Sequence, residues 1–246
     1  MIWFIIATLV AFFIKGLCGF ANTLIFNGIL SYTANNINIS PLEVVLGYPS
    51  NIILVWKERK SLSWKIWLPL TALVVAGSIP GIFLLKHTDA GLLKVIFGIA
   101  VIVIGVEMLF REMKSNRESS NRKPGGSKLV LVLIGIISGL LCGLYGVGAL
   151  LAAYVSRVAE NSHEFKANIC VVFVVENTIR IILYVATGIL TLSVLKQVVI
   201  LIPFMLAAVF LGMKSSSVLN EKIIKKIVIV LLILSGIVLI INNIPR

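Results

Sequence analysis

Long apolar segments separated by short polar ones are the main pattern along this chain. A membrane-spanning helix needs roughly 17–25 mostly apolar residues. Six segments meet or approach this length: 42–56, 66–85, 91–110, 166–187, 192–213 and 224–242. The pattern therefore predicts an all-α, polytopic integral membrane protein.

Two further apolar stretches, residues 1–34 and 128–156, are each interrupted near the middle by a glycine cluster. The arms on either side have about 12–15 residues, or about 18–23 Å at the helical rise per residue. That is short for a hydrocarbon core of about 30 Å. We therefore predict a short, re-entrant-like helical hairpin at each cluster, with glycine at its tip.

The composition excludes several classes of protein. The 246 residues are 59 % hydrophobic and 13 % charged, with a mean hydropathy of +1.07, whereas soluble domains are about 45–50 % apolar and 25 % charged. This excludes a soluble enzyme, a disulfide scaffold and a disordered chain. The cysteines and histidines have no metal-ligand spacing, so we expect no metal and no cofactor. There is no Walker A motif, so we expect no ATP hydrolysis. We also expect no enzymatic activity.

The net charge of +12 reflects 22 Lys and Arg residues against 10 Asp and Glu residues. Sixteen of these basic residues lie in four segments: 57–65, 111–128, 156–166 and 214–226. Basic loops are retained in the cytoplasm. Placing all four segments there puts the N-terminus outside and requires each glycine-tipped hairpin to return to the side it left. The basic excess therefore indicates orientation in a bilayer rather than binding to nucleic acid.

Each half of the chain then contains one hairpin and three crossings. Because an odd number of crossings ends on the opposite side of the membrane, the second half starts on the other side from the first. The two halves are therefore antiparallel, as in many secondary transporters. Matching residues recur in order at offsets that rise from 124 to 131: Cys18 and Cys142, Gly19 and Gly143, Asn51 and Asn177, Gly81 and Gly212. We predict two inverted transport repeats, residues 1–110 and 128–246, joined by a basic cytoplasmic linker at 111–127.

Polar groups inside the apolar segments are the candidates for transport, because they are costly in hydrocarbon unless partnered. Helix breaks add free N–H groups that suit anions, and the two tips are expected to meet near the membrane midplane. The predicted substrate-binding residues are Cys18, Gly19, Asn22, Asn51, Cys142, Gly143, Gly146, Asn177 and Arg180. The predicted coupling residues are Glu176 and Lys15.

Each candidate also has a structural explanation, and the sequence leaves both open. The cysteines are small hydrophobes that suit tight packing, and the asparagines can hydrogen-bond between helices. Glu176 and Arg180, one helical turn apart, can form a structural ion pair, while Lys15 can extend to water. Glu43 and Glu107, at the ends of predicted spans, are interpreted as interfacial.

The second glycine cluster, SGLLCGLYGVG at residues 138–148, resembles the S-G-x-x-G-x-G-G-G pattern of the sulfite exporter TauE/SafE family. The chain is also similar to this family in opening each half with a glycine break. The resemblance implies a secondary transporter, acting as an exporter, of small sulfur-containing anions such as sulfite, thiosulfate or organosulfonates. Two alternatives stay open: transport of another small anion such as a carboxylate, and cysteine-assisted uptake of sulfur compounds.

We expect this transporter to lie in the cell (inner) membrane as a multi-pass protein. Its expected partners are a small anionic substrate and the lipid bilayer, without nucleic acid, and a homo-oligomer remains open. Alternating access around a midplane site is the expected mechanism, because inverted repeats place their binding site between the two halves.

Overall fold

The computed structural model describes residues 1–30, 36–87 and 148–220, together with scattered positions within 95–110, 132–140 and 223–241. The described residues form helices and turns without strands, so the predicted all-α class is confirmed. In chain order the elements are α1 (Ile2–Cys18), α2 (Asn22–Leu30), α3 (Asn36–Glu58), the short 3₁₀ helix η1 (Arg59–Ser61), α4 (Trp64–His87), α7 (Ala149–Val158), α8 (Ser162–Ala186) and α9 (Leu192–Val218). The predicted linker, residues 111–127, lies outside the described residues.

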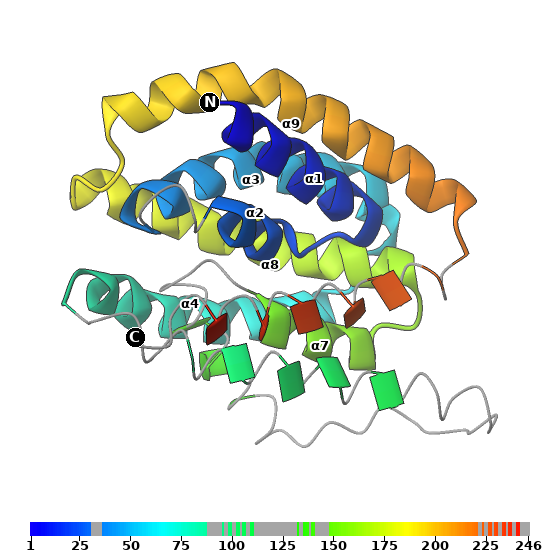
Figure 1. Ribbon diagram of the computed structural model, residues 1–246. Helices are drawn as coiled ribbons and strands as arrows, with labels where there is room; N and C mark the ends of the chain where they lie inside the picture. The colour runs from blue at the N-terminus through cyan, green and yellow to red at the C-terminus, as the bar shows by residue number, and fades with distance from the viewer. Residues whose placement is uncertain are drawn as a thin grey trace.

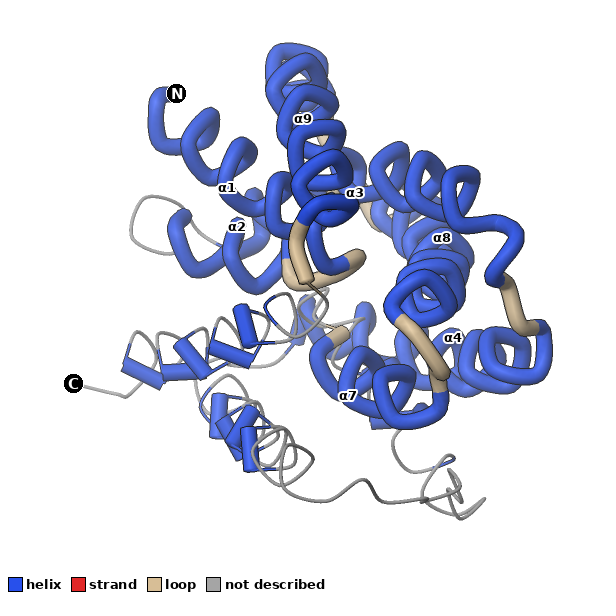
Figure 2. Tube along the Cα trace, turned by 90° about the vertical axis from the view of Figure 1, so that its right-hand side faces the viewer, coloured by secondary structure: helices blue, strands red, loops and turns tan. Residues whose placement is uncertain are grey.

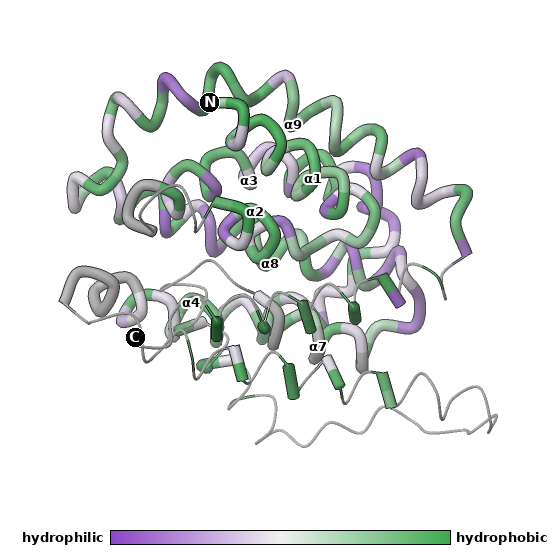
Figure 3. Tube along the Cα trace, viewed as in Figure 1, coloured by the Kyte–Doolittle hydropathy of each residue, from purple (hydrophilic) through white to green (hydrophobic). Residues whose placement is uncertain are grey.

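Three stretches in the described part of the chain are long and apolar enough to cross a membrane: Ile39–Ser61, Ser162–Ala186 and Leu192–Val218. They coincide with three of the predicted spans. Large apolar side chains of α9 are exposed, Phe210 by 55 % and Leu211 by 58 %, and hydrophilic residues of α9 concentrate toward its ends (Figure 3). This is the surface expected of a helix that contacts lipid.

Helices α3 and α8 form the centre of the helix assembly. They pack against each other, α9 packs on α1 and α3, and α4 and α7 pack on α8. Figures 1 and 2 show α1 and α9 on one side of this central pair and α4 and α7 on the other. Buried apolar residues from all of these helices form one continuous core. Polar groups between α1, α3 and α8 are therefore shielded from lipid.

Pairs of glycines bring helix backbones into direct contact. Gly16 of α1 faces Gly212 of α9, and a Cβ added to either glycine would clash with the backbone of the opposite helix. Gly77 of α4 and Gly139 form a second pair of the same kind. Small residues let helices in membranes approach this closely.

The first apolar stretch is broken at Gly19, as predicted. Gly19 adopts a left-handed conformation, with φ of +87°, and its N–H donates to the carbonyl of Lys15 at 2.7 Å. Glycine is the residue that accepts this helix-ending conformation without strain. The next helix, α2, begins at Asn22. The arms differ from the predicted 12–15 residues, because α1 has 17 residues and α2 has nine.

Candidate functional site

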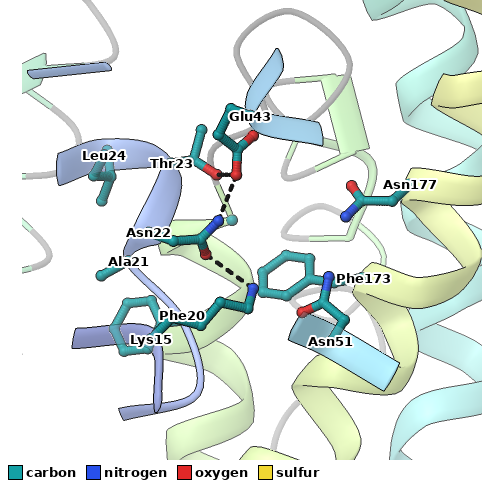
Figure 4. A pocket seen from close by; sticks show the side chains of 11 residues that line it. Lys15, Phe20, Ala21, Asn22, Thr23, Leu24, Glu43, Asn51, Phe173 and Asn177 are labelled. Atoms are coloured by element: carbon teal, nitrogen blue, oxygen red, sulfur yellow. Dashed lines mark hydrogen bonds between the residues drawn. The ribbon is translucent and has the colours of Figure 1, made fainter. Parts of the chain in front are cut away.

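A small cavity lies beside the break between α1 and α2, where these helices meet α3 and α8 (Figure 4). Its lining residues are Lys15, Phe20, Ala21, Asn22, Thr23, Leu24, Glu43, Asn51, Gly148, Phe173 and Asn177. The volume open to the centres of water molecules is about 20 Å³, which suits roughly one water molecule. The cavity is therefore polar, small and built from both predicted halves of the chain.

Lys15 supplies a positive charge to this cavity from the last turn of α1. Its side chain is only 1 % exposed, and Nζ donates to Oδ1 of Asn22 at 2.9 Å. The ammonium also lies 5.4 Å from the ring centroid of Phe173, within the range of a cation–π interaction. Lys15 thus turns inward, and the alternative in which it extends to water is wrong.

Glu43 is the main residue that the sequence interpretation misplaced. It does not face a surface: its side chain is 3 % exposed inside the helix assembly, and Oε1 accepts hydrogen bonds from Nδ2 of Asn22 and, at 2.7 Å, from Oγ1 of Thr23. The reason is that α3 begins at Asn36, before the predicted start of the span, so Glu43 lies well inside the helix. Asn22 therefore links the Lys15 ammonium to the Glu43 carboxylate.

Gly47 gives these groups room to converge. A Cβ at Gly47 would lie 3.3 Å from Oε1 of Glu43, 3.6 Å from Nδ2 of Asn22 and 3.7 Å from Nδ2 of Asn177. Glu43, Gly47 and Asn51 are four residues apart in turn, so they share one face of α3. This spacing is a sequence signal that could have placed Glu43 in the site.

Asn51 and Asn177, predicted as an equivalent pair, line the same cavity from α3 and α8. Asn51 is 0 % exposed, and neither its Oδ1 nor its Nδ2 has a hydrogen-bond partner among the described residues. An unsatisfied buried polar group costs about 1–3 kcal/mol. The Asn51 amide is therefore available to a guest in the cavity.

The first turn of α2 adds backbone donors. Residues 21–24 line the cavity, and the first N–H groups of a helix have no partner within the helix. Together with the partial positive charge of the helix N-terminus, these groups favour an anion.

Arg180 and Glu176 lie next to this cavity but do not contribute to its described lining. Nη2 of Arg180 donates to Oγ of Ser40 at 2.8 Å and to the hydroxyl of Tyr184 at 3.0 Å. Nε lies 3.8 Å from Oε1 of Glu176, and the Ser40 and Tyr184 hydroxyls are 3.1 Å apart. The guanidinium is thus held by three side chains. Its direct contact with substrate stays a prediction.

A family model, that of the sulfite exporter TauE/SafE, matches residues 4–239. The chain belongs to the sulfite exporter TauE/SafE family. This match confirms the resemblance. The family consists of membrane transporters that move sulfur anions such as sulfite, and membership is consistent with transport rather than enzymatic activity. No curated protein and no solved structure matches the chain.

The tip residues of this TauE/SafE protein contribute less to the cavity than predicted. Cys18 is buried, and Gly19 accepts a hydrogen bond from Sγ of Cys170 at 3.3 Å through its carbonyl, but neither Cys18 nor Gly19 is among the lining residues. Cys170 was not singled out from the sequence, because a lone cysteine in an apolar segment carries no spacing signal.

The second tip of this TauE/SafE protein falls on positions that the structure does not describe. Cys142, Gly143 and Gly146 are among them. Gly148, at the end of the same glycine cluster, lines the cavity. Among the described residues, no three His, Cys, Asp or Glu side chains are grouped as metal ligands.

Proposed function

We propose that this chain moves a small inorganic sulfur oxyanion, such as sulfite or thiosulfate, by alternating access around the cavity beside Gly19. The observation that carries the proposal is the buried amide of Asn51, which has no partner among the described residues and lies in a cavity that also holds the Lys15 ammonium. An oxyanion between them would accept hydrogen bonds from the ammonium and from the amides of Asn51 and Asn177. It would also lie at the N-terminus of α2.

The size of the cavity supports an inorganic anion over an organosulfonate. The cavity has space for roughly one water molecule. It would have to expand less to hold sulfite than to hold a substrate with a carbon skeleton. Opening of the cavity on one side would then admit the anion.

The glycine contacts support the inverted repeat. In the predicted duplication, α1 corresponds to the helix that contains Gly139, and α4 corresponds to α9. Gly16 of α1 pairs with Gly212 of α9, and Gly139 pairs with Gly77 of α4, so the two contacts are exchanged by the predicted symmetry between the halves. Rocking of the halves about such contacts would expose the cavity to each side in turn. We place the protein in the inner membrane with its N-terminus outside.

Flux measurements in proteoliposomes test this function. Labelled sulfite, thiosulfate, sulfoacetate and acetate would be compared with protein-free vesicles, using Lys15→Met and, as a matched control, the exposed Lys65→Met. We expect sulfite or thiosulfate flux in the wild type, at least about tenfold less in Lys15→Met, and wild-type flux in Lys65→Met. Flux of none of the sulfur anions above background would contradict the proposal, and a preference for acetate would favour the carboxylate alternative.

A further inference from the structure

The buried charges of the described residues cancel. Six charged side chains are buried there, three cationic and three anionic: Lys15, Lys166, Arg180, Glu43, Glu58 and Glu176. Arg180 pairs with Glu176 at 3.8 Å. Glu58 lies 2.8 Å from Nδ1 of His163 and close enough to Lys166 for their charges to attract. Lys15 and Glu43 are the remaining two, bridged by the side chain of Asn22. The charges of Lys15 and Glu43 therefore balance each other within the site.

An anion that binds Lys15 upsets this balance. Its charge enters a small cavity that already holds the Glu43 carboxylate, and an uncompensated charge in a protein interior is costly. The groups that face Glu43 are Lys15 from α1, Asn22 and Thr23 from α2, and Arg180 and Glu176 from α8. Arg180 also acts on Glu43 but is paired with Glu176 at 3.8 Å. Among the described lining residues, Lys15 is therefore the cation that two negative groups would have to share.

We propose that Glu43 takes up one proton when the anion binds, so that the protein moves an anion and a proton together. This inference rests on the proposed function. The proton comes from water on the side to which the cavity is open and binds a carboxylate oxygen of Glu43, which becomes neutral. The ammonium of Lys15 is then paired with the anion alone. After the cavity opens to the other side, the anion leaves and Glu43 releases its proton to water there.

The geometry selects Glu43 rather than Glu176 as the proton carrier. Glu43 lines the cavity and shares Asn22 with Lys15. Glu176 lies outside the described lining, next to Arg180, so its charge is already compensated. A protonated Glu43 also gains an O–H donor that faces the cavity and can bond to an anionic oxygen.

The test uses the full-length protein in liposomes with the membrane potential clamped at zero by valinomycin and equal potassium. The probes are labelled sulfite and labelled thiosulfate. Thiosulfate keeps a fixed charge at neutral pH, so its own protonation does not contribute to the proton count. With one proton per anion, an inward gradient of about one pH unit concentrates the anion about tenfold inside wild-type vesicles. We expect Glu43→Gln to equilibrate the anion without concentrating it, and the exposed control Glu160→Gln to behave as the wild type.

The outcomes separate the two proposals. If the wild type moves neither probe, the proposed function fails, and this inference fails with it. If the wild type equilibrates a probe without concentrating it, the transport function stands and the proton-coupling inference is overturned. Concentration that persists in Glu43→Gln but disappears in Glu176→Gln would assign the proton to Glu176 instead. Should Glu43→Gln fail to fold, Glu43→Asp, which keeps a carboxylate, is expected to retain concentration.

Discussion

Replacing Asn51 by leucine separates a binding role from a structural one. Leucine has nearly the same shape as asparagine but no polar atoms, and both polar atoms of the Asn51 side chain lack partners among the described residues. Removing an unsatisfied buried amide gains about 1–3 kcal/mol of unfolding free energy. For a chain of this size, that raises the melting temperature by about 2–12 °C. We expect Asn51→Leu to be more stable than the wild type and to lose sulfur-anion transport.

Asn168 provides the matched control for this prediction. It is also fully buried, but its Oδ1 accepts a hydrogen bond from the N–H of Ser63 at 3.0 Å, and its Nδ2 donates to the carbonyl of Glu164 at 2.7 Å. Asn168→Leu should therefore lower the melting temperature. The assay is thermal unfolding in detergent, followed by tryptophan fluorescence, alongside flux in liposomes. If Asn51→Leu melted as low as Asn168→Leu, or transported normally, Asn51 would be a structural residue and the reasoning would be refuted.

Three further predictions concern the helix contacts and the break. Gly16→Val should destabilise the fold by about 1–3 kcal/mol through overpacking against α9, whereas Gly28→Ala, where an added Cβ meets nothing within 4 Å, should not lower the melting temperature. Gly19→Ala should cost about 1–2 kcal/mol because alanine is strained at a φ of +87°; an unchanged melting temperature would contradict this. Tyr184→Phe removes a hydroxyl that Arg180 donates to, and chemical denaturation should show a loss of about 1–3 kcal/mol; an unchanged free energy of unfolding would contradict this.

The hydropathy pattern was sufficient to predict three membrane-spanning helices of the described residues and the first break. Apolar segments of membrane-spanning length became α3, α8 and α9, and the glycine cluster at residues 16–19 ended α1. The pattern also indicated Lys15, Asn22, Asn51 and Asn177, which the fold brings to one cavity. Polar residues within apolar segments are informative because a membrane core tolerates few of them.

The hydropathy pattern could not predict contacts between segments that are distant in the sequence. Glu43 was interpreted as interfacial because hydropathy marks where apolar residues begin, whereas α3 starts earlier at Asn36. Its partner Asn22 is 21 residues away, and the pairing depends on how α2 folds back. Similarly, Arg180 bonds to Ser40, which is 140 residues away. No local periodicity indicates which side chain a buried guanidinium will meet.

The glycine break is what allows Lys15 and Asn22 to form one polar unit. In a continuous helix, residues seven apart are separated by about 10.5 Å along the axis, too far for a site in which both side chains contact one small guest. The break at Gly19 turns the chain so that Asn22 begins a new helix and its Oδ1 lies 2.9 Å from Nζ of Lys15. The same turn places Lys15 in the last turn of α1, where the helix dipole favours a cation, and leaves the N–H groups of α2 for an anion. A single interruption of one helix therefore brings the charge of Lys15, the side chain of Asn22 and the N–H donors of α2 to the same cavity.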